Sequence, residues 1–200
     1  MKRMASLAFI LLLASVSLAH AAAIVGQRAP SFELRDADGK SVKLDSYRGK
    51  YVVLEWTNFG CPFVGKQYGS GNMQSLQKKY TEKGVVWLTI CSSAKGKQGY
   101  VDGAGAKEGM KERDAAPTRF LLDPKGSVGK SYGAKTTPHM FVIDPKGAVI
   151  YNGAIDDKPS TNKDDVPTAK NYVAAALDES MAGTKVETSA TQPYGCSVKY

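Results

Sequence analysis

The feature that most constrains this chain is a cysteine placed where a buried strand ends and a helix begins. Residues 51–68 read YVVLEWTNFGCPFVGKQY. The run from Val52 to Thr57 is mostly apolar, has the length of a buried strand, and is followed by turn-forming residues. Pro62 suits the first turn of a helix, where its missing N–H has no partner to lose. The sequence therefore predicts Cys61 at the amino end of a helix.

That position favours the thiolate of Cys61, which is the nucleophilic form of the side chain. Free amide groups and the positive end of the helix dipole stabilise a negative sulfur. The dipole contributes only about 0.3–1 kcal/mol, which lowers a thiol pKa by less than about one unit. Other donors are therefore needed for Cys61 to ionise at neutral pH. The alternative is a buried cysteine that serves as a small apolar residue, and position alone leaves both interpretations open.

The first 21 residues are expected to be a secretory signal peptide. Lys2 and Arg3 precede an apolar run up to Leu18, and the small residues of the segment 19–21 (AHA) provide a cleavage site. The apolar run is shorter than the roughly 20 residues that span a bilayer. We therefore expect a periplasmic or secreted protein that is free of the membrane once its signal peptide is removed.

Cleavage would leave one domain, residues 22–183, followed by a flexible arm, residues 184–200. The mature chain would carry 25 basic and 19 acidic residues, a net charge of +6, with its lysines scattered. This pattern does not indicate a nucleic-acid-binding protein, which typically has a basic stripe. His139 would be the one histidine left, which argues against a cysteine–histidine metal site. No motif for a flavin or nicotinamide is present either, so we expect no cofactor.

The chain has three cysteines, Cys61, Cys91 and Cys196. An odd number in an oxidising compartment leaves at least one thiol free or in an intermolecular bond, and three internal pairings are open. Cys91 ends a second apolar run, residues 85–90. If the two strands are parallel, Cys91 emerges at the same edge of the sheet as Cys61.

Turn residues and hydrophobic periodicity predict alternating strands and helices. Pro138 indicates a sharp loop that enters a strand, and we expect a cis bond there. The first half of the chain is predicted to form a β-hairpin at 32–44, a strand at 52–57, a helix from 62 that breaks near 69–71, and a second helix ending at 84. A strand at 85–90 and a strand at 120–122 follow, and a loop with a short helix at 95–113 separates them. The last predicted elements are a helical turn at 128–132, an antiparallel pair at 139–144 and 148–154, and a helix from 167 to 183.

In this order of elements the chain resembles the thioredoxin fold, and it is similar to the redoxins of the alkyl hydroperoxide reductase/thiol-specific antioxidant (peroxiredoxin-like) family. The resemblance covers residues 22–183 and is carried by GQRAPSFELRDADGKSVKLDSYRGKYVVLEW, CPFV and TTPHMFVIDPKGAVIYNGAID. It implies an α/β fold with a central mixed sheet flanked by helices, an N-terminal β-hairpin and an extended C-terminal arm. It also implies a cis-proline at Pro138, packed against a redox-active Cys61.

Two departures from the family pattern bear on the chemistry. Val64 stands where thioredoxin-type reductases have the second cysteine of Cys-x-x-Cys, which excludes dithiol chemistry within that motif. Peroxiredoxins have Pro-x-x-x-Thr/Ser-x-x-Cys and an arginine beside the cysteine, but the matching positions here are Leu54 and Asn58, and Pro138 holds the place of the arginine. The candidate substitute donors are Thr57, Asn58, Lys66 and Arg119.

The resemblance also implies a role for Cys196. Peroxiredoxin-like chains often resolve a sulfenic acid with a second, distant cysteine, and a flexible arm would bring Cys196 to Cys61 in the same chain or in the partner subunit of a homodimer. A static disulfide is the alternative, because closing a loop of about 135 residues contributes up to roughly 5 kcal/mol. Tyr194 is a candidate anchor for the arm, whereas Cys91 and His139 are expected to be packing residues.

We therefore expect an exported thiol-dependent oxidoreductase with antioxidant, peroxiredoxin-like activity, in which Cys61 is the nucleophile and Cys196 the resolving cysteine. The active-site support residues are Thr57, Asn58 and Pro138. The expected partners are an external thiol that donates electrons and a peroxide or protein disulfide as substrate. Two alternatives remain, namely a thiol–disulfide exchange protein that acts on exported clients and a redox-inactive binding protein with a thioredoxin fold.

Overall fold

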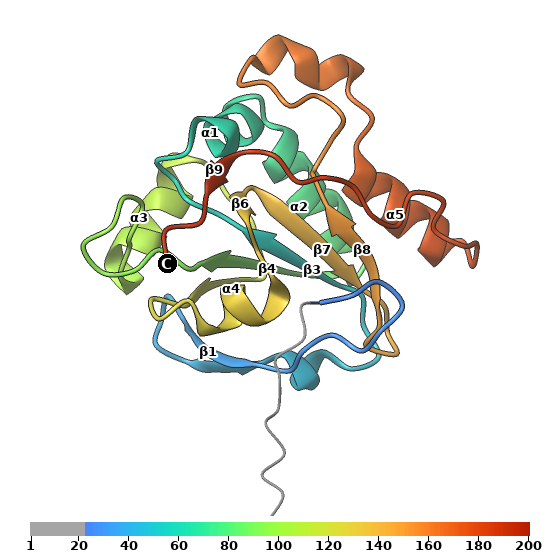
Figure 1. The fold of residues 1–200 in the computed structure, drawn as a ribbon, viewed down its shortest axis with the longest axis horizontal. Helices are drawn as coiled ribbons and strands as arrows, with labels where there is room; N and C mark the ends of the chain where they lie inside the picture. Colours follow the sequence, from blue (N-terminus) through green and yellow to red (C-terminus); the bar gives the residue numbers. More distant parts are fainter. Residues whose placement is uncertain (1–22) are drawn as a thin grey trace, which may run out of the picture.

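The computed structural model describes residues 23–200, so the expected signal peptide at 1–21 lies outside the described residues. Within residues 23–200, seven strands form one sheet in the order β2-β1-β5-β4-β3-β7-β8, and β6 and β9 form a separate pair (Figure 1). The strands are β1 (Glu33–Asp36), β2 (Ser41–Lys43), β3 (Val52–Trp56), β4 (Val86–Cys91), β5 (Arg119–Leu122), β6 (Thr136–Thr137), β7 (His139–Ile143), β8 (Val149–Gly153) and β9 (Cys196–Ser197).

The sheet is mixed, and helices cover both of its faces. Strand β4 runs parallel to β3 and β5, whereas the other neighbouring strands are antiparallel. Side chains alternate across a strand, so Val53 packs with α1, α2 and α5, while Leu54 and Trp56 pack with α4 and η1 on the other face. The helices are α1 (Pro62–Gly69), α2 (Asn72–Glu82), α3 (Gly103–Glu112), α4 (Ser127–Tyr132) and α5 (Tyr172–Met181), with 3₁₀ helices η1 (Leu44–Tyr47) and η2 (Lys163–Thr168).

The predicted fold class and most predicted elements are confirmed. The hairpin is β1 with β2, and the break between α1 and α2 lies at Gly71, whose φ of 77° is in the left-handed region that favours glycine. The bond between Thr137 and Pro138 is cis, as predicted. These features depend on residues close together in the sequence, which is why the sequence alone was sufficient to predict them.

The last helix begins later than predicted. Pro167 lies inside η2, and α5 starts at Tyr172. The reason is an asparagine cap: the Asn171 side chain accepts a hydrogen bond from the Ala174 amide at 2.9 Å. Such a cap satisfies one of the amides that a helix start leaves without a partner, so α5 begins after Asn171.

The segment after α5, residues 184–200, runs across one end of the sheet to β9 (Figure 1). We call this segment the arm. It is extended, as predicted, and it is docked on the domain along its length. The amide of Thr191 donates to the Asn152 carbonyl at 3.1 Å, and the Ala94 amide donates to the Lys199 carbonyl at 2.8 Å. The arm therefore lies against β8 at one end and against the loop after β4 at the other.

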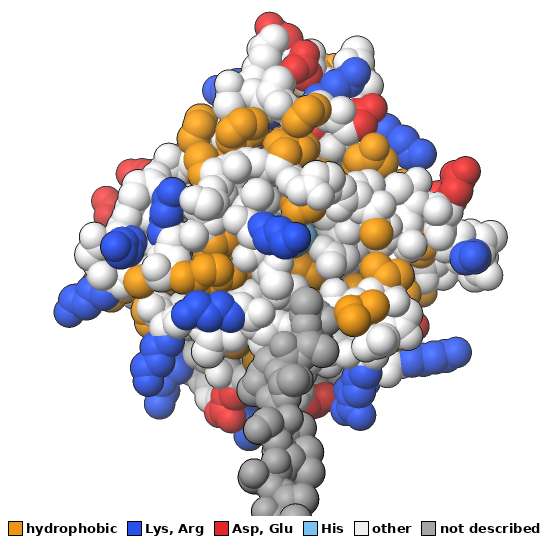
Figure 2. All heavy atoms as spheres, in the orientation of Figure 1, with side chains coloured by type: hydrophobic (Ala, Val, Ile, Leu, Met, Phe, Trp, Pro, Cys, Tyr) orange, Lys and Arg blue, Asp and Glu red, His pale blue; other side chains and the backbone are white. Residues whose placement is uncertain are grey.

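The surface carries dispersed positive charge. Figure 2 shows Lys and Arg side chains spread over this face of the molecule instead of gathered in a stripe. Among residues 23–200, no helix combines the length and apolar character of a membrane span.

Glu55 is a buried acid in the middle of β3. Its carboxyl oxygens accept hydrogen bonds from the Tyr68 hydroxyl and the Trp87 indole, both at 2.9 Å. They also accept from the Gln77 amide at 3.2 Å and the Thr89 hydroxyl at 2.9 Å. Burial raises the pKa of Glu55, and the four donors oppose that increase. This one side chain thus links α1, α2 and β4 to β3.

Replacing Glu55 by alanine should lower the free energy of unfolding by at least about 3 kcal/mol, because four buried donors would lose their acceptor. Chemical denaturation measures the change. The matched control is Glu33→Ala, since Glu33 is an exposed acid at the start of β1 and should tolerate the same substitution with little effect. Equal losses in the two variants would contradict this role of Glu55.

Candidate active site around Cys61

Cys61 caps the amino end of α1, as the sequence predicts. It has extended backbone angles and is followed by Pro62 in the first turn, and its carbonyl accepts the Gly65 amide at 2.8 Å. The side chain is only 1% exposed. Its thiol donates a hydrogen bond to the main-chain oxygen of Thr137 at 3.0 Å. The sulfur therefore lies between the start of a helix and the loop that carries Pro138.

The sheet explains why these two segments meet. Strands β3 and β7 are antiparallel, and their register pairs Trp56 with His139. The residues just after β3 therefore lie beside the residues just before β7. This places Thr137 and the cis-proline next to Cys61, although the two segments are far apart in the sequence.

Cys196 enters the site from the arm. Strand β9 pairs antiparallel with β6, and the register places Cys196 opposite Thr137. Cys61 and Cys196 are both free thiols, and Cys196 packs against the buried cluster that contains Cys61. Gly195 makes this approach feasible, because a Cβ atom there would lie 2.1 Å from the Thr137 oxygen, and its φ of +136° favours glycine.

The two thiols have opposite pKa shifts. Burial raises the pKa of Cys61, but hydrogen bonds from the side chains of Cys196 and Thr137 and from the amides of Val64 and Cys196 hold it below its ordinary value. Burial raises the pKa of Cys196 to about 11, and its interaction with Cys61 adds to that increase. At neutral pH the negative charge is therefore favoured on Cys61, which makes it the better nucleophile of the pair.

The predicted support residues Thr57 and Asn58 directly follow β3, and they make different contacts. The Thr57 hydroxyl is buried and has no hydrogen-bond partner among residues 23–200. The Asn58 side chain binds the Gly60 amide at 2.8 Å and Gln98, while its main-chain oxygen accepts the Cys61 amide at 2.9 Å. Asn58 thus shapes the turn before Cys61. The contribution of either residue to reactivity stays a prediction.

The two cations considered as substitute donors are engaged elsewhere. Lys66 donates to the Lys158 carbonyl at 2.7 Å and lies 3.9 Å from Asp156. Arg119 lies 3.5 Å from Asp36, on the β1 side of the sheet. The main influences on the pKa of Cys61 are burial and neutral hydrogen-bond donors. The site therefore differs from the arginine-assisted site that the peroxiredoxin resemblance implies.

Cys91 and His139 contact other parts of the core. The Cys91 thiol donates to the Gly99 carbonyl at 3.3 Å, packs in a different cluster from Cys61, and has a pKa raised by burial. The His139 Nδ1 accepts the Lys135 amide at 3.2 Å, so Nε2 carries the proton and donates to Asn152 at 2.8 Å. Burial lowers the pKa of His139 to about 4, which keeps the ring neutral at physiological pH.

Two residues of the site were not identified from the sequence. The Thr137 hydroxyl is buried and meets no hydrogen-bond criterion within residues 23–200. It nevertheless lies close enough to the sulfur to lower the pKa of Cys61. Gly195 is needed for the close approach of the arm. Each is next to a residue that the sequence identified as a candidate, Thr137 beside Pro138 and Gly195 beside Cys196. Being next to those candidates is the sequence signal by which Thr137 and Gly195 could have been found. No group of three or more His, Cys, Asp or Glu side chains in the described chain could hold a metal ion.

The ultraviolet absorbance of the thiolate should show Cys61 ionising at a lower pH than an ordinary cysteine, whereas Cys196 should ionise only near pH 11. Because the Cys196 side chain is one of the donors, Cys196→Ala should raise the pKa of Cys61. Cys196→Ser keeps a donor and should leave that pKa low. If Cys61 titrates at or above the ordinary value in the folded protein, this description of the site is wrong.

Gly195→Ala should separate the arm from Thr137, because the added methyl group meets a main-chain oxygen and the backbone angle is strained. We expect faster alkylation of Cys61 and a lower yield of the Cys61–Cys196 disulfide under mild oxidation, both measured by mass spectrometry. Gly183→Ala is the matched control, since Gly183 also has a positive φ (+77°) but has no atom near its would-be Cβ. Similar behaviour of the two variants would show that the effect does not come from arm docking.

Comparisons with known proteins agree with this fold. The AhpC/TSA family model matches residues 25–152, which is more than half of the chain. A crystal structure of an uncharacterized conserved protein from Geobacillus kaustophilus has a TM-score of 0.75 at 26% identity, covering 89% of this chain and 93% of that chain. A putative thiol:disulfide interchange protein DsbE from Chlorobium tepidum has a TM-score of 0.53 at 28% identity, covering 64% and 84% of the two chains.

A curated relative is similar over a shorter region. It is the thiol-disulfide oxidoreductase ResA of Bacillus thuringiensis subsp. konkukian, which is 29% identical over 114 residues, or 57% of this chain. The chain spans 60% of the length of that relative. On the match of the family model and the thioredoxin-like arrangement of sheet and helices, the chain belongs to the AhpC/TSA family.

Proposed function

We propose that this protein is a thiol–disulfide oxidoreductase that exchanges disulfides with client proteins through Cys61 and Cys196. The observation that carries the proposal is the pairing of β6 with β9, which brings a second free thiol to the buried Cys61. Two neighbouring thiols with opposite pKa shifts provide a nucleophile and a resolving group. Cys196 would thus take the part that the second cysteine of Cys-x-x-Cys has in thioredoxin-type reductases.

The reaction has two exchange steps. The Cys61 thiolate attacks one sulfur of the client disulfide, so that a Cys61–client bond forms and the other client sulfur leaves as a thiolate. Cys196 loses its proton and attacks Cys61, forming the Cys61–Cys196 disulfide and releasing the second client thiolate. The client gains two electrons and two protons, and the protein dithiol becomes a disulfide. An external thiol donor restores the dithiol by the same steps in the opposite direction.

The residue three positions after Cys61 cannot perform the second step. Val64, at the position of the missing cysteine, is a fully buried apolar residue. A resolving thiol must therefore come from elsewhere, and the docked arm supplies it from the same chain. This supports an intramolecular disulfide over the intersubunit bond that a homodimer would use.

The names of the similar proteins support the same chemistry. ResA and the DsbE protein are described as a thiol-disulfide oxidoreductase and a thiol:disulfide interchange protein. Because the matched region is only 60% of the length of ResA, the particular clients of that protein do not transfer to this chain. A signal peptide at 1–21 would place the protein in the periplasm or outside the cell, where client disulfides form.

Reduction of peroxides is the second candidate function, and membership of the AhpC/TSA family favours it. In that reaction the Cys61 thiolate attacks a peroxide oxygen, becomes a sulfenic acid and releases an alcohol or water. The Cys196 thiol then attacks the sulfenic sulfur, which forms the Cys61–Cys196 disulfide and releases a water. Arg113 and Arg119 do not favour it, because Arg113 stacks on the Phe59 ring at 4.4 Å and Arg119 pairs with Asp36.

A trapping experiment distinguishes these functions. With a peptide that contains one disulfide, Cys196→Ser should accumulate a Cys61–peptide mixed disulfide, because the second step is blocked, and Cys61→Ser should accumulate none. Mass spectrometry detects the adduct. Parallel treatment of the reduced wild-type protein with hydrogen peroxide should oxidise Cys61 slowly. Rapid sulfenic acid formation without peptide adducts would favour the peroxidase, and no reaction in either assay would favour the redox-inactive binding protein.

A further inference from the structure

Tyr194 joins the arm to the same helix that begins at Cys61. Only Gly195 separates Tyr194 from Cys196 in the sequence. Its ring lies edge-on to Phe63 of α1, with 5.8 Å between ring centroids. The Nζ atom of Lys66, also on α1, lies 5.8 Å from the centre of the Tyr194 ring. Two positions on α1 thus hold the Tyr194 ring, and both follow Cys61 within the first turns of that helix.

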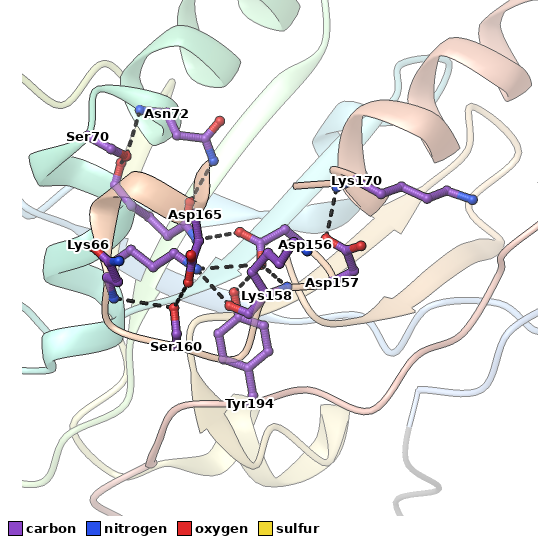
Figure 3. Close-up of polar contacts among 12 residues, drawn as sticks. Lys66, Ser70, Asn72, Asp156, Asp157, Lys158, Ser160, Asp165, Lys170 and Tyr194 are labelled. Carbon is purple, nitrogen blue, oxygen red and sulfur yellow. Dashed lines mark hydrogen bonds and ion pairs between the residues drawn. The ribbon is translucent and has the colours of Figure 1, made fainter. Parts of the chain in front are cut away.

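The Tyr194 hydroxyl binds a buried carboxylate that is itself attached to α1. It donates to Asp156 Oδ1 at 2.5 Å, and Asp156 is only 2% exposed (Figure 3). The other Asp156 oxygen accepts the Gln67 side-chain amide at 2.7 Å. The Lys158 amide also donates to Asp156, at 2.9 Å. We call this group, Lys66, Gln67, Asp156 and Tyr194, the latch.

The hydroxyl of Tyr194 is the donor in this bond. Burial and the adjacent Asp156 carboxylate raise the pKa of Tyr194 above its ordinary value, so the phenol keeps its proton. An O–H group that donates to a carboxylate makes a stronger bond than one between neutral partners. Releasing Tyr194 would take a donor from a buried carboxylate, which is unfavourable. The latch therefore holds this part of the arm against α1.

The other side chains that hold the arm contact different elements. The Thr191 hydroxyl accepts the Ala154 amide at 2.9 Å, just after β8. The Tyr200 hydroxyl donates to the Ala134 carbonyl at 2.7 Å, just after α4. Among these anchors, Tyr194 is the one that binds the helix of the nucleophile. Its position therefore fixes Cys196 relative to Cys61, and not merely relative to the sheet.

We infer that Tyr194 is a positioning residue that sets the effective concentration of Cys196 at Cys61 and limits the access of other thiols and disulfides to Cys61. This inference rests on the proposed function, since it concerns the step in which Cys196 attacks Cys61. The latch opens to admit a client, and it closes as Cys196 attacks Cys61 and displaces that client. Weakening the latch should therefore expose Cys61 and make its disulfide with Cys196 easier to reduce.

The test is the equilibrium of the protein with glutathione. One oxidised glutathione and the protein dithiol give the Cys61–Cys196 disulfide and two reduced glutathione molecules, and the equilibrium constant reports the effective concentration of the two thiols. In Tyr194→Phe, which loses only the hydroxyl, this constant should fall about ten-fold. The rate at which iodoacetamide alkylates Cys61 in the reduced protein should rise several-fold.

Tyr51→Phe is the matched control. The Tyr51 hydroxyl donates to the Ser180 carbonyl at 3.0 Å, between the segment before β3 and the end of α5, and within residues 23–200 it makes no hydrogen bond to the residues of the latch. This variant loses a partly buried tyrosine hydrogen bond to a main-chain carbonyl and should leave both the equilibrium constant and the alkylation rate unchanged. Asp156→Asn, which weakens the same bond from the acceptor side, should shift both quantities in the direction seen for Tyr194→Phe.

The outcomes separate this inference from the proposed function. If the wild-type protein forms no Cys61–Cys196 disulfide with oxidised glutathione, the proposed function fails and this inference fails with it. If the wild type forms the disulfide and Tyr194→Phe behaves like Tyr51→Phe, only the inference is overturned. If both latch variants fail to fold, as judged by circular dichroism, Tyr194 is a structural residue and the positioning role is also overturned.

Discussion

The main chain at Thr137 is the point on which the candidate site depends. Its carbonyl accepts the thiol of Cys61, and its backbone pairs with Cys196 across the two short strands β6 and β9. Thr137 reaches this position because β7, which follows it, is held against β3 in a register that pairs Trp56 with His139. The sheet thus fixes one short segment, and that segment in turn brings two cysteines together.

Two buried acids hold the helix that begins at Cys61. Glu55 on β3 accepts a hydrogen bond from the Tyr68 hydroxyl of α1. Asp156, which follows β8 in the sequence, accepts a hydrogen bond from the Gln67 side-chain amide of α1. Buried carboxylates are costly unless donors satisfy them, and here the donors come from separate elements. The result is a helix whose last turn is held in place, with the sulfur of Cys61 at its other end and no second cysteine in its first turn.

In the function we propose, a long-range contact with the arm takes the place of that second cysteine. In a Cys-x-x-Cys motif one helical turn places the two sulfurs together, whereas here Val64 is buried and Cys196 comes from the far end of the sequence. Such an arrangement makes both the shielding of Cys61 and the supply of the second thiol depend on the docking of one segment. If Cys61 and Cys196 exchange disulfides as proposed, access and resolution are coupled, because the movement that admits a client also displaces the arm that carries Cys196.

The sequence by itself determined the local parts of this structure. The apolar run before Cys61, Pro62 after it and Pro138 before β7 predicted a cysteine at a helix start near a cis-proline, because each signal acts on residues a few positions away. It also identified Cys196 and Tyr194 as candidates. Only the tertiary structure decided that the arm docks beside Thr137, that Lys66 binds Asp156 and not the sulfur, and that Cys91 lies in another cluster. Those outcomes depend on strand register and on which buried donor meets which acceptor, and neither is encoded in a short stretch of sequence.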